Sequence, residues 1–410
     1  MTLTGATGTA PAASDQAGAL HRRIADAVAD LAPRLLAVSR ELHAHPELAL
    51  VEHRAAALLA DVLDAEGFTV DRGVGGVPTA FRGDVGDPAG GPTVALLCEY
   101  DALPGIGHGC GHNLIAAGGL GAALALHRVL PELPGRLTCL GTPGEEGAGG
   151  KVLLLDAGVF DDVDAALMFH PGDRTLAVRH ATACQPLVVE FTGRAAHAAA
   201  SAPEGRSALA AMIQFFVGTD ALRQFVPETC RLHGIISHGG EAANVVPAYT
   251  RAEFMVRGLL GEVVDDVTAR VEAVAQAAAA ATGTSVTVTR GPRYAERKNN
   301  KVMAGRLAGH LERGGVPVEE AVLRGGTGSS DIGNVSLRLP TIHPYLQVMD
   351  AGTPTHSEAM AEAVVTPRAE QAMLRMATAL ACTAADLFTE PGLLDSAREE
   401  FATTGPDVPR

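Results

Sequence analysis

A chain of 410 residues, 47% of them hydrophobic and 19% charged, has the composition of a globular protein with large cores, which excludes a disordered or fibrous one. This length exceeds one ordinary core and predicts two or three folding units. The 47 acidic and 32 basic residues give a formal net charge of -15, which argues against non-specific binding to nucleic acid or to an anionic membrane.

The cysteines and the lack of a targeting pattern indicate the compartment in which the protein is expected to work. The six cysteines form no CxxC pair and no dense framework, which is typical of free thiols. Residues 1–19 lack the basic and apolar regions of a signal peptide, so we expect a flexible leader. No apolar run reaches the ~18–20 residues of a membrane span. We therefore place the protein in the cytoplasm, with neither a membrane nor a nucleic acid as partner.

The first half of the chain alternates predicted helices and strands. Apolar residues recur at helical spacing over 20–45 and 53–66, and the second helix is expected to stop at Gly67. Short β-branched or leucine-rich runs predict strands, and helical stretches separate them. The strands cover 93–98, 136–140 and 164–169, and the helices lie near 114–130 and 150–157. This alternation predicts βαβ units, a mostly parallel sheet and an α/β fold.

From about residue 184 the pattern changes. The predicted order is strand, helix, strand, strand, helix, strand, over 186–192, 206–224, 231–237, 249–256, 261–282 and 284–290. This order is typical of a ferredoxin-like α+β domain with a four-stranded antiparallel sheet. We predict an inserted domain at 184–293 that interrupts a first domain made of 20–183 and 294–410. Helices at 301–314 and 366–388 would complete that first domain.

The loop after strand 93–98 holds the first candidate metal ligands. It reads Gly-His-Gly-Cys-Gly-His at 107–112 and lies at the carboxyl edge of the predicted sheet, where open α/β folds bind ligands. Glycines on both sides of Cys110 free the backbone to aim Cys110 and His112 at one point. A thiolate and an imidazole suit a borderline metal such as zinc. The alternative is a glycine-rich turn whose histidines only hydrogen-bond the next helix N-terminus.

More candidate donors follow later strands. Glu145 and Glu146 stand on a turn just past strand 136–140, where one carboxylate can bind metal while the other handles protons, although adjacent glutamates are usually a solvated pair. His170 ends the third strand, where a lone histidine is more often structural. A late turn before a helix supplies another histidine. The donors are too many for one tetrahedral zinc and suit two ions with open positions: Cys110, His112, Glu146, His170 and His356.

These motifs resemble those of the metallopeptidase and amidohydrolase family that contains aminoacylases, carboxypeptidase-G-like enzymes and plant auxin-amide hydrolases. The resemblance starts near residue 37 (AVSRELHAHPEL), runs to about 388 and keeps the order and spacing of the motifs. It implies a two-metal catalytic domain interrupted by a ferredoxin-like lid or dimerisation domain, and a homodimer through that lid. It also implies two divalent ions per subunit and Cys110 as their bridging ligand. The cysteine and three histidines themselves suit zinc, with manganese or cobalt as alternatives.

The resemblance assigns further roles. Glu145 would be the general base, and Asp101 a carboxylate that orients a metal ligand. His197 matches a lid histidine that hydrogen-bonds the developing oxyanion in the partner's site, and Asn244 matches a residue that helps hold substrate. Separately from the resemblance, Arg257 ends a lid strand, where it would meet a substrate carboxylate. From the residues alone, His197 is also a surface histidine and Arg257 an exposed strand charge.

The branch within the family bears on the substrate. Asn113, where many of these amidohydrolases carry Asp, and the segments at 99–108 and 328–336 resemble the β-alanyl-dipeptide hydrolases. We therefore expect hydrolysis of an amide bond in a small N-acyl amino acid or dipeptide. The alternatives are a p-aminobenzoyl-glutamate-type aryl amide hydrolase and a non-catalytic metal-binding dimer that acts as a sensor or scaffold. Metal binding alone has no use for a base, so the Glu145–Glu146 pair favours an enzyme.

Overall fold

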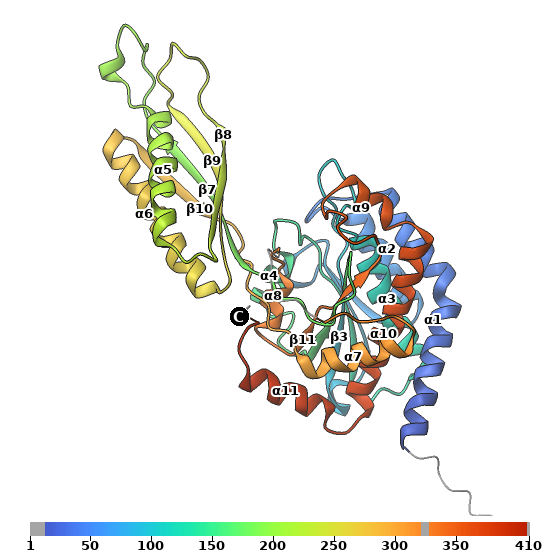
Figure 1. The fold of residues 1–410 in the computed structure, drawn as a ribbon. Helices are drawn as coiled ribbons and strands as arrows, with labels where there is room; N and C mark the ends of the chain where they lie inside the picture. The colour runs from blue at the N-terminus through green and yellow to red at the C-terminus, as the bar shows by residue number, and fades with distance from the viewer. Residues whose placement is uncertain (1–12, 321–327, 408–410) are drawn as a thin grey trace, which may run out of the picture.

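The computed structural model describes residues 13–320 and 328–407, which form a large α/β domain and a smaller α+β unit beside it (Figure 1). Residues 1–12 of the predicted leader lie outside the described residues, and the first helix begins at Ala13, inside the segment predicted as leader. None of the described helices has both the length and the apolar character needed to cross a membrane.

The large domain is built on a six-stranded sheet, which confirms the predicted α/β class. In spatial order its strands are β1 (Thr69–Arg72), β2 (Phe81–Gly86), β4 (Arg136–Gly141), β3 (Thr93–Cys98), β5 (Ala165–Leu167) and β11 (Thr341–Ile342). Neighbours from β4 to β11 run parallel, whereas β1 and β2 form an antiparallel edge that the sequence pattern does not predict. Cys98 pairs with Gly141, so β3 and β4 end side by side. The loops that follow these two strands therefore start at the same sheet edge.

Helices cover both faces of this sheet. The apolar core on one face includes residues of α1 (Ala13–Ala44), α3 (His112–Val129), α7 (Lys301–Arg313) and α10 (Pro367–Thr389). The core on the other face includes α4 (Gly150–Asp156) and α8 (Ile332–Ser336). α3 lies so close to β3 that a Cβ at Gly119 would come 2.5 Å from the carbonyl oxygen of Leu97. Its first residue, His112, is thereby held at the edge where β3 ends. The other helices are α2 (His53–Ala65), α9 (Glu358–Ala363) and α11 (Leu393–Thr403).

A two-stranded parallel ladder of β6 (His170–Gly172) and β12 (Tyr345–Gln347) adjoins the sheet. The single strand predicted at 164–169 was wrong in its extent, because β5 ends at Leu167 and His170 begins a separate strand. A strand of three residues is too short to show a periodicity. In the ladder His170 pairs with Tyr345, and the two rings stack with their centres 5.0 Å apart.

The smaller unit has the predicted ferredoxin-like α+β arrangement. Along the chain its elements are β7 (Ala183–Thr192), α5 (Ala208–Leu222), β8 (Arg231–His238), β9 (Tyr249–Gly258), α6 (Gly261–Thr282) and β10 (Ser285–Arg290). The antiparallel sheet order is β10-β7-β9-β8, and both helices lie on one face of it (Figure 1). We call residues 183–290 the inserted unit. Its action as a lid or in dimerisation stays a prediction.

Candidate active site

Donor atoms from four separate segments meet at the carboxyl edge of the large sheet. Sγ of Cys110 lies 3.4 Å from Nε2 of His170, and Oε1 of Glu146 lies 3.3 Å from Nε2 of His356. Three overlapping groups have ligand atoms within 4.8 Å of one another: Cys110–His112–His170, Cys110–Glu146–His356 and His112–Glu145–Glu146. The structure thus brings together every metal ligand predicted from the sequence, and Cys110, His112 and Glu146 each belong to two of these groups.

The spacing and hydrogen bonding of these residues fit divalent metal ions. Two nitrogen or oxygen ligands of a tetrahedral zinc lie about 3.3 Å apart, and a sulfur ligand slightly farther. Buried polar atoms normally have a hydrogen-bond partner, yet Nε2 of His112 and Oε1 of Glu146 make no well-aligned hydrogen bond, although Oε1 of Glu99 and Nε2 of His356 lie 3.1 Å and 3.3 Å away. Burial also raises the pKa of the Cys110 thiol to about 12, so a nearby cation is needed to hold it as a thiolate.

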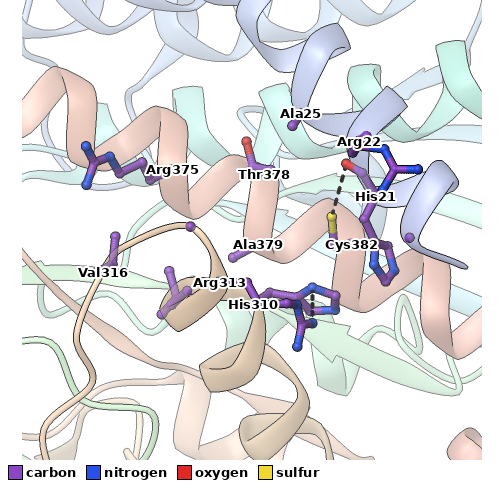
Figure 2. Close-up of a pocket in the computed structure, with 13 residues that line it drawn as sticks. His21, Arg22, Ala25, His310, Arg313, Val316, Arg375, Thr378, Ala379 and Cys382 are labelled. Carbon is purple, nitrogen blue, oxygen red and sulfur yellow. Dashed lines mark hydrogen bonds between the residues drawn. The ribbon is translucent and has the colours of Figure 1, made fainter. Parts of the chain in front are cut away.

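A second group of donors, His21, His310 and Cys382, lies between α1, α7 and α10 (Figure 2). Nε2 of His21 and Nε2 of His310 lie 2.7 Å and 2.8 Å from the two carboxylate oxygens of Asp386, which are ordinary hydrogen-bond lengths. Arg313 donates to Nδ1 of His310 at 2.8 Å, which leaves the proton of that ring on Nε2. This group is therefore a hydrogen-bonded network that joins three helices, not a set of free ligands.

Asp101 connects two of the candidate ligands. Nδ1 of His112 lies 2.9 Å from the backbone carbonyl oxygen of Asp101 and 3.2 Å from Oδ1 of Asp101. Nδ1 therefore carries the proton, and Nε2 is the ring nitrogen that can bind metal. The other oxygen, Oδ2, accepts the backbone N–H of Glu146 at 2.8 Å. Burial raises the pKa of Asp101, but these contacts and the charge of His112 lower it below the ordinary value overall. Asp101 lies where a carboxylate that orients a ligand is predicted.

The adjacent glutamates Glu145 and Glu146 have different electrostatic surroundings. Burial, together with the negative charges of Glu99 and Glu146, raises the pKa of Glu145 well above its ordinary value. Burial also raises the pKa of Glu146, but the close contact with His356 and the charge of His112 lower it overall. Neighbouring carboxyl groups with separated pKa values are typical of an acid–base residue beside a permanently ionised one.

A buried ion-pair group behind His112 was missed by the sequence analysis. Lys151, fully buried on α4, forms ion pairs with Glu99 and with Asp331, whose Oδ1 lies 2.8 Å from Nζ. Oε1 of Glu99 in turn lies 3.1 Å from Nε2 of His112. The only signal in the sequence is that Lys151 is one of three lysines in a chain that otherwise uses arginine.

The predicted residues of the inserted unit divide into two groups. Arg257 lines the same cavity as Glu145, with a volume of about 390 Å³, and donates to Ser329 at 3.0 Å. His197 and Asn244 are not brought to the metal ligands. They lie in the loops that follow β7 and β8, where the Ala198 N–H donates to the carbonyl of Asn244 at 3.0 Å. These two loops are at the end of the inserted unit that points away from the large domain (Figure 1).

Comparison with known proteins agrees with this geometry. Residues 95–379 match the model of the family described as Peptidase family M20/M25/M40. The Xaa-Arg dipeptidase of Mus musculus is 39% identical, with 93% of this chain and 92% of that protein covered. A p-aminobenzoyl-glutamate hydrolase chain of Escherichia coli is 30% identical, with 93% of this chain and 94% of that one covered.

Among solved structures, a Bacillus subtilis protein described as a dinuclear metal binding peptidase from the M20 family has the same fold. The TM-score is 0.63 at 20% identity, over 87% of this chain and 98% of that one. The family resemblance deduced from the motifs is confirmed. The chain belongs to peptidase family M20/M25/M40 and is a hydrolase of peptide or amide bonds.

Proposed function

We propose that the protein hydrolyses the amide bond of a small N-acyl amino acid or dipeptide at a centre of two divalent metal ions. The observation that carries this proposal is the pair of adjacent glutamates: Glu146 faces His356 as a ligand, and Glu145 is buried beside it with a raised pKa. A non-catalytic sensor or scaffold has no use for the second carboxylate. The relative from Bacillus subtilis, described as dinuclear, supports the metal count.

Five side chains would hold the two ions, zinc in the first place and manganese or cobalt as alternatives. The residues that would hold them are Cys110, His112, Glu146, His170 and His356. When bound, such ions lower the pKa of a water and polarise the scissile carbonyl.

The chain's own residues position the reaction and move its protons. Asp101 keeps the proton of His112 on Nδ1 and aims Nε2 at the centre. Glu145 would take a proton from the attacking water and deliver one to the leaving amine. Its place is fixed from behind, because the hydroxyl of Tyr294 donates to the backbone carbonyl of Glu145 at 2.6 Å. Burial of Glu145 keeps bulk water from competing for that proton.

We extend the proposal to a homodimer formed through the inserted unit in the cytoplasm. His197 lies in a loop distant from the metal ligands of its own chain, so its predicted contact with the oxyanion requires a second subunit. Nδ1 of His197 accepts the N–H groups of Ala199 and Ala200 at 3.2 Å and 3.1 Å, which leaves Nε2 as the donor. Such a donor is worth ~3–4 kcal/mol in other enzymes. Asn244 in the neighbouring loop would help hold the substrate.

A hydrolysis panel tests the proposed function. The protein is stripped with a chelator, refilled separately with zinc, manganese and cobalt, and supplied with N-acyl amino acids, β-alanyl dipeptides and p-aminobenzoyl-glutamate. We expect cleavage of the first or second class that disappears on chelation and returns with metal. Cleavage confined to p-aminobenzoyl-glutamate would favour the aryl amide alternative, and metal binding without any cleavage would favour a sensor or scaffold.

A further inference from the structure

Arg297 is a buried arginine that lacks a carboxylate partner. Its side chain is 1% exposed, its Nη1 reaches only the backbone carbonyl of Arg179 at 3.3 Å, and its Nε has no hydrogen-bond partner. Within the described part of the chain no acidic side chain lies within 4.0 Å of it; the nearby Asp407 pairs with Lys301 instead. A buried guanidinium is costly unless an anion compensates it, so an anion that enters this part of the cavity would be stabilised by Arg297.

A second guanidinium lies beside it. The Cζ atoms of Arg179 and Arg297 lie 4.3 Å and 5.9 Å from the centre of the same ring, that of Tyr345. Like Arg297, Arg179 forms no ion pair with the described residues. Contact with an aromatic face offsets part of the desolvation of each cation, but it leaves both charges in place. Two adjacent unpaired guanidinium groups are the arrangement that binds a carboxylate through several N–H donors.

The position of this pair connects it to the proposed reaction. Arg179, Arg297 and Tyr345 line the same cavity as Cys110 and Glu145. The ring of Tyr345 stacks on His170, so the two cations lie one aromatic ring away from a candidate metal ligand. Among the described lining residues the carboxylates are Glu145 and Glu146, both at the metal end. The cavity is therefore acidic where the metals would bind and basic beyond Tyr345.

We infer that Arg179 and Arg297 form a carboxylate subsite and that the preferred amide releases a dicarboxylic amino acid of the glutamate or aspartate class. The inference rests on the proposed function and narrows its substrate. Arg257, a third cation in the cavity, remains to meet the other carboxylate of such a product. Three cations in this cavity also repel a basic residue, although one relative is described as an Xaa-Arg dipeptidase.

Matched substrates test the inference. N-acetyl-glutamate, N-acetyl-glutamine and N-acetyl-arginine share one acyl group, and the first two differ almost only in charge. We expect kcat/KM for the glutamate compound to exceed that for the glutamine compound by about tenfold or more, with the arginine compound slowest. Arg179→Gln and Arg297→Gln should each remove most of this preference. Arg174→Gln, an exposed arginine 3.8 Å from Glu319, is the control and should keep it.

Equal rates on the glutamate and glutamine compounds, or a preference for arginine, would overturn the inference while leaving amide hydrolysis intact. If no amide is cleaved, the proposed function fails, and binding of glutarate to the metal-filled protein, measured by calorimetry, then tests the subsite alone. We expect glutarate to bind the wild-type protein and to bind Arg179→Gln about tenfold more weakly or worse. Arg179 is only half-buried, so Arg179→Gln avoids the risk of misfolding that Arg297→Gln carries. If Arg179→Gln bound glutarate as tightly as the wild-type protein, this result would count against the subsite.

Discussion

Oδ1 of Asp101 lies 3.2 Å from Nδ1 of His112, while Oδ2 of the same carboxylate accepts the backbone N–H of Glu146 at 2.8 Å. One buried side chain therefore sets the tautomer of one candidate ligand and fixes the backbone of another. Partners of this kind behind metal ligands are worth roughly 10–100-fold in metal affinity.

We predict that Asp101→Asn weakens metal binding about 10–100-fold. The neutral amide has one acceptor oxygen, so it cannot accept hydrogen bonds from both His112 and the Glu146 N–H as the carboxylate does. The affinity is measured by competition with a chromophoric chelator. Asp71→Asn, on an exposed residue of β1, is the matched control and should bind metal normally. An Asp101→Asn protein with unaltered metal affinity would show that Asp101 has no orienting role.

The ion pairs of Lys151 predict a large effect on stability. Lys151→Met would leave Glu99 and Asp331 buried without their cation. We expect the free energy of unfolding in urea to fall by about 3–5 kcal/mol. Lys298→Met removes an ammonium group that donates to the backbone carbonyl of Phe401, and it should cost much less because no carboxylate loses its cation among the described residues. A loss for Lys151→Met no larger than for this control would contradict the assigned pairing.

Stability should also depend on pH through Glu52. Burial raises the pKa of Glu52 from 4.5 to about 7, so the folded state favours the protonated form. The contribution of Glu52 to the free energy of unfolding is full below pH 4.5 and is lost as the pH rises through 7. The free energy of unfolding falls by about 3 kcal/mol over this range. Glu52→Gln, which keeps the neutral form, should therefore exceed the wild-type unfolding free energy at pH 8 and match it near pH 4.5. Exposed Glu132→Gln should follow the wild type throughout, and a parallel curve for Glu52→Gln would disprove the raised pKa.

Mixing two inactive variants tests the role of His197 across a dimer. In a heterodimer of His197→Ala with Glu145→Gln, the site that keeps Glu145 receives an intact His197 from the partner. Random exchange of equal amounts should restore about a quarter of the wild-type sites, since half of the dimers then carry one complete site each. The readout is amidase activity after the subunits are exchanged. Activity no greater than the sum of the separate variants would mean that His197 does not act across a dimer.

The helices and strands that could be predicted from the sequence are those long enough to show a clear hydrophobic periodicity. The strand at 93–98 and the helix at 261–282 coincide with β3 and α6, and alternating strands and helices indicated the α/β class correctly. The antiparallel edge of β1 and β2 was missed. β1 has four residues, mostly exposed, so its sequence has neither the apolar run nor the alternation that marks a strand.

Most of the candidate metal ligands could be located from the sequence because they follow strands that end at one edge of the sheet: Cys110 and His112 follow β3, and Glu146 follows β4. The basic end of the cavity could not be located in this way, since it depends on contacts between distant segments. Tyr345 meets His170 only because β6 pairs with β12, and Arg297 reaches the same ring from a loop before α7. The burial of Lys151 is likewise invisible until Glu99 and Asp331 are placed around it.

The central claim is that adjacent glutamates have different tasks, Glu145 as the base and Glu146 as a metal ligand. The most direct measurement compares metal content and turnover of Glu145→Gln with those of Glu146→Gln. The account predicts that Glu145→Gln keeps two ions per chain and loses at least about a hundredfold in kcat, because only proton transfer is removed. Glu146→Gln should lose metal as well as activity. A Glu145→Gln protein that keeps most of its turnover, or that loses its metal as Glu146→Gln does, would contradict the account.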